Sequence, residues 1–414
     1  MTTRRLLGLI LISLSMAAGV IALVSDASGL DSNPVIAVRG VSPDATSDNG
    51  QHKLARASDG TLYLAFSGPV DGLEQAQVYF SLDDGQTWKP DAVLAQDGVW
   101  SDLPTLAAGA DGRIDAAWVD YEGVGNVWYA TRTDGDWSEF EKISPGETYA
   151  GFPAMVIREG MASVLWYAAP PDETREHGSA YEIFHSELDS TGWTTPVLLS
   201  SGSEDALNPA LAADDAGNLH GAWFQIVLQD YAAQHAFFDG VTWEMPFTVS
   251  PVTDTATGVA IEVDGRGIAH MVWEQASGSD VGIAYSRLEG DTWTEPLMLS
   301  ETHSLDPVMA FDADDNILVA WSEDGAITAR RNDGAWSAPV TLGQGMNPAL
   351  LGGETVLAAW TRDTEASPVI MVGEIEATEA GTGASVYWVA AAITLLAGLA
   401  VLFWGRSGRS EVES

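Results

Sequence analysis

Four residues stand at matching places in the chain, one or two residues after a tryptophan, and could act on a glycosidic bond. They are Asp120, Glu274, Glu323 and Arg362. Two carboxylates about 5–9 Å apart can cleave a sugar linkage, one as the acid and the other as the base or nucleophile. These four residues are our candidates for catalysis. The alternative is chance, because a chain with 59 acidic residues places carboxylates on every face.

Polar and aromatic residues near the ends of the same segments are candidates for ligand binding. One set lies just before a repeated hairpin and consists of Asp102, Asn208, Asp306 and Asn347. A second set, Tyr121 and Tyr167, follows the tryptophans, and these rings could stack on sugars or cap the core. The long loop at residues 168–180 adds Arg175 and His177, because loops on a rigid scaffold commonly carry binding residues. For the two asparagines, a turn-forming role before proline is the alternative.

A repeated β-hairpin positions all of these residues. In its clearest copy, residues 208–223, a short apolar strand follows a proline, an Asp/Gly/Asn turn reverses the chain, and a second strand ends at a tryptophan. A second unit, with its own tryptophan and a following strand, lies between successive hairpins. Four short strands in roughly 50 residues, repeated along the chain, indicate a β-propeller. The aromatics that end the hairpins are Phe66, Trp118, Trp166, Trp223, Trp273, Trp321 and Trp360.

The two ends of the repeat array predict the number of blades. The seventh repeat has an inner hairpin at residues 348–360 and an outer strand at 368–375, but it lacks a fourth strand. The isolated N-terminal segment 34–38 resembles the strand that follows the tryptophan in other repeats. We therefore predict an all-β fold of seven four-stranded blades over residues 34–376, closed by the N-terminal strand. Six or eight blades are the alternatives.

One outer turn carries a recognisable motif, Ser-x-Asp-x-Gly-x-Thr-Trp, formed by Ser81, Asp83, Gly85, Thr87 and Trp88. It resembles the Asp-box (BNR) repeat of sialidase-like β-propellers, and degenerate copies recur in later repeats. The resemblance implies a propeller in which the aspartate accepts hydrogen bonds within its own turn and the tryptophan packs between blades. In sialidases, an arginine that binds the substrate carboxylate stands two residues before an inner-strand proline. The resemblance does not include this motif, because no arginine stands at that place in any repeat of this chain.

No metal or cofactor site is predicted. The chain has no cysteine, and its seven histidines lack the spacing of zinc ligands. Asp312, Asp314, Asn316 and Glu323 mimic an EF-hand calcium loop, but Ile317 replaces the glycine that the loop requires, so we interpret the segment as a turn. Neither a Gly-rich phosphate loop nor a nucleophile elbow occurs.

Both ends of the chain indicate a membrane, and the overall charge excludes a nucleic-acid partner. Residues 1–27 have the layout of a signal peptide, with an uncleaved anchor as the alternative. After a spacer at 377–384, the uncharged apolar run 385–404 is long enough for a transmembrane helix. Arg406 and Arg409 assign the tail 405–414 to the cytoplasm. The net charge of −41 repels a phosphate backbone.

These features predict an extracellular propeller held on the cell membrane by a single C-terminal helix. The main interpretation is a non-catalytic module that binds an extracellular glycan or protein through the channel face. The alternative is a sialidase-like glycoside hydrolase that acts on extracellular glycans, and a third is a mainly structural surface protein. Function must be decided by the geometry of the site, since one fold supports many activities.

Overall fold

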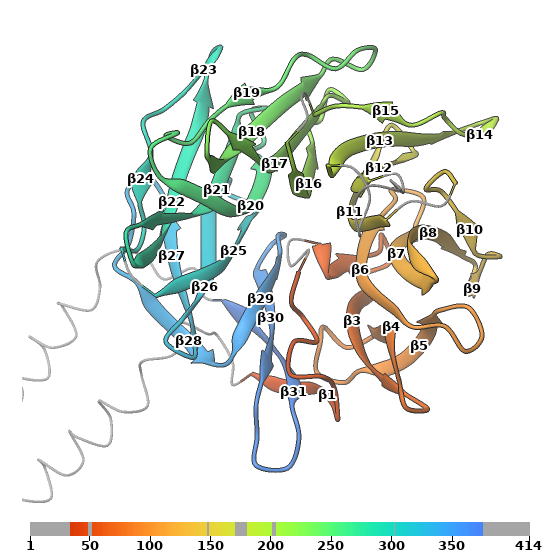
Figure 1. Ribbon diagram of the computed structural model, residues 1–414. Coiled ribbons are helices and arrows are strands. Elements are labelled where there is room, and N and C mark those ends of the chain that lie inside the picture. The colour runs from red at the N-terminus through yellow and green to blue at the C-terminus, as the bar shows by residue number, and fades with distance from the viewer. Residues whose placement is uncertain are drawn as a thin grey trace, which may run out of the picture. The chain divides into compact units, whose positions relative to one another are not determined.

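The computed structural model describes residues 34–48, 52–146, 149–169, 180–200, 204–301 and 303–375. These residues form seven antiparallel sheets. Figure 1 shows the sheets as blades arranged in a ring, with one edge strand of each blade turned toward the centre. The described part of the chain therefore confirms the seven-bladed prediction.

Blades 1 to 4 each run from an inner to an outer strand in chain order. Blade 1 contains β2 (Leu54–Arg56), β3 (Leu62–Val70), β4 (Leu73–Ser81) and β5 (Lys89–Leu94). Blade 2 contains β6 (Ser101–Ala108), β7 (Ile114–Glu122), β8 (Val124–Thr133), β9 (Asp136–Trp137) and β10 (Glu141–Lys142). Blade 3 contains β11 (Tyr149–Arg158), β12 (Met161–Ala169), β13 (Glu182–Asp189), β14 (Gly192–Trp193) and β15 (Val197–Leu198). Blade 4 contains β16 (Ala206–Ala213), β17 (Leu219–Val227), β18 (Asp230–Phe238) and β19 (Phe247–Thr248).

Blades 5 and 6 repeat this order, and blade 7 joins the two ends of the propeller. Blade 5 contains β20 (Thr255–Val263), β21 (Ala269–Ser277), β22 (Asp280–Glu289), β23 (Thr292–Trp293) and β24 (Leu297–Met298). Blade 6 contains β25 (Ser304–Phe311), β26 (Ile317–Glu323), β27 (Ala326–Asn332) and β28 (Val340–Gln344). Blade 7 contains β29 (Met346–Leu351), β30 (Val356–Arg362), β31 (Val369–Ile375) and β1 (Val35–Arg39).

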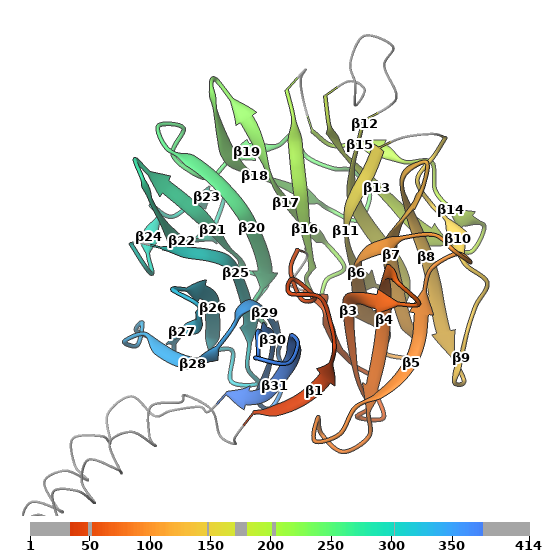
Figure 2. The same ribbon diagram turned by 60° about the horizontal axis from the view of Figure 1, so that its bottom comes forward.

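The N-terminal strand closes the ring, as predicted. β1 pairs antiparallel with β31, with Val35 opposite Val372 and Arg39 opposite Val369. Figure 2 shows the two strands side by side. Because β1 supplies the outer strand of blade 7, the first and last described strands share one sheet.

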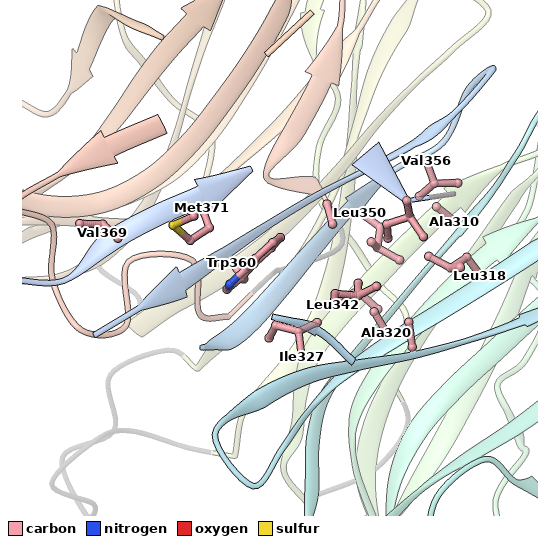
Figure 3. Packing of buried hydrophobic residues seen from close by; sticks show 14 residues of the cluster. Ala310, Leu318, Ala320, Ile327, Leu342, Leu350, Val356, Trp360, Val369 and Met371 are labelled. Carbon is pink, nitrogen blue, oxygen red and sulfur yellow. The ribbon is translucent and has the colours of Figure 1, made fainter. Parts of the chain in front are cut away.

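A large aromatic side chain from each inner hairpin fills the interface with the preceding blade. Trp223 of blade 4 packs among residues of blade 3, and Trp273 of blade 5 packs among residues of blade 4. Phe66 fills the equivalent place between blades 7 and 1. The six tryptophans at these positions are at most 1% exposed. Figure 3 shows the interface between blades 6 and 7, where Trp360 lies among residues of both blades, including Leu342 and Met371.

The Asp-box-like turn has the structural role that its residues predict. The Asp83 carboxylate accepts hydrogen bonds from the Thr87 N–H at 2.9 Å and the Thr87 hydroxyl at 2.7 Å. Gly85 has a φ of 81°, a conformation that glycine adopts without steric cost. The Trp88 indole donates to the Gly85 carbonyl at 2.9 Å, and its ring packs at the interface of blades 7 and 1.

Several predicted features lie outside the described residues. They are the signal peptide or anchor at 1–27, the spacer at 377–384, the apolar segment at 385–404, the tail at 405–414, and the binding candidates Arg175 and His177. In the part of the chain that the structure describes, no helix has both the length and the apolar character needed to cross a membrane.

Burial favours the neutral form of three of the four histidines that are buried in the described part of the chain. His185 accepts the Trp243 indole N–H at Nδ1, at 3.0 Å, and its Nε2 lies 2.8 Å from the Ser163 hydroxyl. Nδ1 of His220 lies 3.0 Å from Nε2 of His235. Burial lowers the pKa of His185 and His220 to about 4 and that of His235 to about 3.

We expect truncation of residues 34–39 to lower the melting temperature of the whole propeller in one cooperative step. Without β1, the backbone of β31 loses its ladder partner and the interface that contains Val38 opens. Differential scanning calorimetry measures the effect. Mutation of the exposed Trp100 (52% exposed) to alanine is the control for loss of a surface contact. An unchanged melting temperature in the truncated chain would show that β1 does not close the ring.

We also expect stability to fall on acidification from about pH 6.5. The unfolded chain binds protons at its histidines near that pH, whereas the folded chain does so only near pH 4 or below, so acid favours unfolding. His235→Phe should reduce the loss of melting temperature between pH 7.5 and 5, although its absolute stability changes too. The exposed His303→Asn variant should keep the wild-type slope. Equal slopes in all three proteins would contradict the assignment.

Candidate functional site

The inner strands open at the channel with a repeated backbone irregularity. Six residues there have a left-handed φ between 47° and 56°. They are Leu103, Phe152, Asn208, Gly258, Asp306 and Asn347. The strand register shifts at each of these places, which marks a β-bulge. Five of the six precede a proline, and such strained backbone persists only when surrounding contacts hold it. Five of the six bulge residues, Phe152, Asn208, Gly258, Asp306 and Asn347, line the same cavity.

A cavity of about 240 Å³ lies among these bulges. Inner strands from six blades and residues 46–48, which lead from β1 toward blade 1, line its wall. Its volume is just below the ~300–1,000 Å³ typical of pockets for drug-sized ligands, so it suits a group of about one sugar ring. Three carboxylates face it, Asp48, Glu274 and Asp306, whereas none of the lining residues that the structure describes is an arginine or lysine.

Glu274 and Asp306 form a connected pair across the boundary between blades 5 and 6. One oxygen of the Glu274 carboxylate accepts the backbone N–H of Asp306 at 2.9 Å, and the other accepts the Thr257 hydroxyl at 2.8 Å. The Ser322 hydroxyl donates to Asp306 at 3.1 Å. The site also requires glycine at position 258, because a Cβ there would lie 2.6 Å from the Glu274 carboxyl carbon.

The two carboxylates depart from the pattern that the other blades follow. Residues directly after the terminal aromatics are Ser67, Val119, Tyr167, Phe224, Glu274, Ser322 and Thr361. The Ser322 hydroxyl accepts the backbone N–H of Asn347, and the Thr361 hydroxyl accepts that of Thr46. Glu274 accepts the N–H of Asp306 in the same way. Glu274 is the single carboxylate in this set of seven. Asp306 is likewise the single carboxylate among the six left-handed bulge residues.

The environment of Asp306 favours its protonated form. Burial, and secondly the negative charge of Glu274, raise the pKa of Asp306 to about 6, although the Ser322 hydrogen bond acts in the opposite direction. A carboxyl group with a pKa near 6 is half protonated under mildly acidic conditions, and it can therefore donate a proton to a bound molecule. Raised carboxyl pKa values in clefts are a recurrent property of catalytic sites.

A buried lysine lies behind the third carboxylate. The Lys53 side chain is fully buried, and its ammonium donates to the Pro104 carbonyl at 2.9 Å. Burial lowers the pKa of Lys53 to about 8, while the charges of Asp102 and Asp48 oppose this shift. Withdrawal from bulk water raises the pKa of Asp48, and the Lys53 charge partly offsets the effect. Lys53 thus neutralises negative charge from beneath and leaves the carboxylate of Asp48 facing the cavity.

Aromatic residues line another part of the cavity. Phe152 and Phe224 line the cavity, from blades 3 and 4. The Phe152 ring packs on Tyr167 with centroids 5.5 Å apart, and the Phe224 ring packs edge-on to Tyr231 at 5.1 Å. A further pair, the half-exposed Trp100 and Tyr121, has ring centroids 5.4 Å apart. Apolar rings and carboxylates in one cavity suit a sugar, which presents both an apolar ring face and polar hydroxyl groups.

The structure brings some predicted residues together and separates others. Asn208, Glu274, Asp306 and Asn347 all line the cavity, and Asp102 lies beside it, where it accepts the Ser67 hydroxyl. Asp120 instead is fully buried, and its carboxylate accepts the Trp118 indole N–H at 2.9 Å and the Gln96 N–H at 3.3 Å. The prediction that Asp120 stands on the open channel face is therefore wrong, because this carboxylate satisfies groups of its own blade.

The remaining candidates stand away from the cavity wall. Glu323 accepts a hydrogen bond from Ser304 at 3.4 Å, and Arg362 lies opposite Val369 in β30. Tyr167 supports Phe152 from behind, and burial raises its pKa, whereas the pKa of the more exposed Tyr121 is raised to about 12. The EF-hand-like segment is a turn in which Arg331 pairs with Asp312. Within the described ranges, no three acidic or histidine side chains are grouped so that they could hold a metal ion.

Sequence reasoning missed Asp48, Lys53, Phe152 and Phe224. Asp48 and Lys53 lie between the closing strand and the first hairpin, where no repeat pattern marked a position. A signal did exist for Phe224, since it occupies the same place after the tryptophan as Glu274 does in the next repeat.

Comparisons with known proteins show the fold of the chain. No protein-family model matches the sequence, and no curated protein matches it either. Among solved structures, the chain is similar to an ulvan lyase that is described as a new family of polysaccharide lyase and is bound to a GlcA(1-4)Rha3S unit. The identity is 12%, the alignment covers 83% of this chain and 96% of that chain, and the TM-score is 0.56. It is also similar to an α-L-arabinanase from Penicillium chrysogenum complexed with arabinobiose, with 11% identity, coverage of 83% and 99%, and a TM-score of 0.50.

A third similar structure is a puromycin-hydrolyzing peptidase from Mycobacterium tuberculosis. The identity is 13%, the alignment covers 84% of this chain and 56% of that chain, and the TM-score is 0.51. At such low identity these likenesses establish the β-propeller architecture alone. Two of the three structures are of glycan-active enzymes.

We expect Asp306→Asn to stabilise the protein more at pH 8 than at pH 4. With a folded pKa of about 6 and an ordinary value of 3.8, the folded state holds the proton more tightly than the unfolded state, so the stability that Asp306 contributes is lost as pH rises from about 4 to 6. Asparagine keeps the shape, tolerates the left-handed φ and carries no charge. The pH-dependent gain should be about 1–3 kcal/mol.

Thermal melts of the variant and the wild type at both pH values measure this difference. Asp291→Asn, which removes an exposed carboxylate at an outer turn, is the matched control and should show no such dependence. A gain that is equal at pH 4 and pH 8 would contradict the raised pKa of Asp306.

Proposed function

We propose that the protein is a glycan-cleaving β-propeller in which Glu274 and Asp306 act as the acid–base pair at the channel. The observation that carries this proposal is their position. Each is the one carboxylate in its set of equivalent ring positions, both line the cavity, and the backbone N–H of Asp306 donates to the Glu274 carboxylate at 2.9 Å. Glu274 and Asp306 differ in type from the residues at the equivalent positions of the other blades, and both lie at the cavity. This combination favours a role in function over a role in the fold.

The proposed reaction is hydrolysis. Protonated Asp306 donates its proton to the oxygen of the leaving sugar as the glycosidic C–O bond breaks. Glu274 then acts on the opposite side as the base that removes a proton from the attacking water, or as a nucleophile that a later water displaces. The rings of Phe152 and Phe224 hold the apolar face of the sugar while this occurs.

We further propose that the substrate lacks acidic groups. The described residues of the cavity wall include three carboxylates and no arginine or lysine, and this charge would repel a uronate, sialate or sulfated sugar. The sequence also lacks the arginine pattern with which sialidases bind an acidic sugar, although its Asp-box turn resembles that of sialidase-like propellers.

The cellular setting of the proposal rests on the sequence. We propose that the apolar segment 385–404 anchors the chain, with the propeller outside the cell and the tail 405–414 inside. The substrate would then be a glycan of the cell surface or its surroundings.

Binding without cleavage is the second candidate. Both Glu274 oxygens already accept hydrogen bonds from the protein, from the Asp306 N–H and the Thr257 hydroxyl, and this arrangement also suits a purely structural carboxylate. In that case the cavity would bind a glycan or protein ligand, and the two carboxylates would fix its walls.

We expect Glu274→Gln and Asp306→Asn each to lower kcat by about 10²–10⁴-fold on a neutral oligosaccharide that the wild type cleaves, since each removes one proton-transfer group. A panel of arabino-, xylo- and gluco-oligosaccharides, followed by chromatography, identifies that substrate. The wild-type rate should fall as pH rises above about 6, as Asp306 loses its proton.

Asp291→Asn is the charge-matched control and should retain full activity. Full activity in both cavity variants would refute the catalytic assignment. Binding by the wild type without any turnover across the panel would support the second candidate.

A further inference from the structure

We propose that the cavity contains an ammonium subsite, formed by Asp48 together with Phe152 and Phe224, and that the preferred glycan carries free amino groups. This inference rests on the proposed function in one respect, the use of the channel cavity as the glycan site. It adds a substrate class, amino sugars whose nitrogen is not acylated.

The charge balance of the wall is the first argument. Asp48, Glu274 and Asp306 contribute carboxylates to a cavity of about 240 Å³. The histidine on this wall, His52, lies 3.7 Å from the Glu262 carboxylate and is therefore already paired with an acid. The Lys53 ammonium is fully buried and donates to the Pro104 carbonyl, so it does not enter the cavity. Among the described lining residues, no cation offsets these carboxylates from inside the cavity, and Lys53 offsets only part of the charge from behind Asp48.

An incompletely satisfied polar atom is the second, independent argument. Thr105 lines the cavity and is fully buried, yet its hydroxyl oxygen has no hydrogen-bond partner among the described residues. A buried hydroxyl without a partner costs about 1–3 kcal/mol, which a bound polar group can recover. The hydroxyl can accept a hydrogen bond from an ammonium or donate one to a sugar hydroxyl.

The type of cation follows from the shape of the site. Among the described residues, no three acidic or histidine groups converge closely enough for a metal ion. An ammonium on a sugar ring instead makes several separate hydrogen bonds, and it is attracted to the faces of aromatic rings such as Phe152 and Phe224. The same rings pack on the apolar face of the sugar, so one amino-sugar ring contacts both the carboxylate and the aromatic residues.

The test compares three tetramers of matched length on the full-length chain, by isothermal titration calorimetry at pH 6. They are tetraglucosamine, tetra-N-acetylglucosamine and tetragalacturonate. We expect tetraglucosamine to bind at least about tenfold more tightly than the N-acetylated tetramer, and tetragalacturonate to bind least. The tenfold preference should shrink between about 0.1 M and 1 M salt, where the Debye length falls from roughly 10 to 3 Å.

Asp48→Asn should remove most of the amine preference, measured as the ratio of the affinities for tetraglucosamine and the N-acetylated tetramer. Asparagine suits this position because Asp48 has a φ of 49°. Asp291→Asn again serves as the matched control, and thermal melts confirm that both variants fold. Equal affinities for the three tetramers, or a preference that survives Asp48→Asn, would overturn the inference.

Cleavage of the tetramers is followed in parallel, so the two proposals fail separately. An amine preference without cleavage would uphold the subsite and remove the hydrolase assignment. Cleavage of neutral oligosaccharides without an amine preference would do the reverse.

Discussion

The packing of one aromatic side chain into every interface between blades is the constraint on which the rest of the structure depends. Each blade alone is a small sheet with two faces that must be covered. The six buried tryptophans and Phe66 cover these faces because each packs against the preceding blade. β1 completes blade 7, so blade 7 also packs against blade 1 and the ring is closed. Closure of this ring fixes where every inner strand begins, and those beginnings are the cavity wall.

Because the ring is rigid, it can hold strained and poorly solvated groups at its centre. The left-handed bulge residues and the raised pKa of Asp306 both cost free energy that the inter-blade cores supply. The Thr257–Glu274–Asp306–Ser322 contacts extend this support directly to the carboxylates. Position 258 must remain glycine for the same reason, since any side chain there would displace Glu274. The architecture and the candidate chemistry are therefore linked through backbone geometry.

The repeat made the fold predictable, and departures from it made part of the site predictable. Spacing of the tryptophans indicated the blades, and the unpaired segment 34–38 indicated the closing strand, which the pairing of β1 with β31 confirms. Glu274 and Asp306 were both candidates from the sequence. Their contact was not predicted, because it joins two blades and sequence spacing carries no information on contacts between blades. Asp120 shares a repeat position with Glu323 but turns inward to Trp118, a choice of side-chain direction that the repeat does not specify. Lys53 was missed because a buried ammonium depends on partners from neighbouring segments, here Pro104, Asp102 and Asp48.

The central claim is that the channel cavity, which Glu274, Asp306, Phe152 and Phe224 line, is where a glycan binds. A crystal structure of the Glu274→Gln chain soaked with tetraglucosamine tests it most directly. The account predicts one sugar ring inside the cavity, with a glycosidic oxygen within hydrogen-bond distance of Asp306 and an amino group directed at Asp48. A sugar bound only on the outer strands, with the cavity empty, would contradict it.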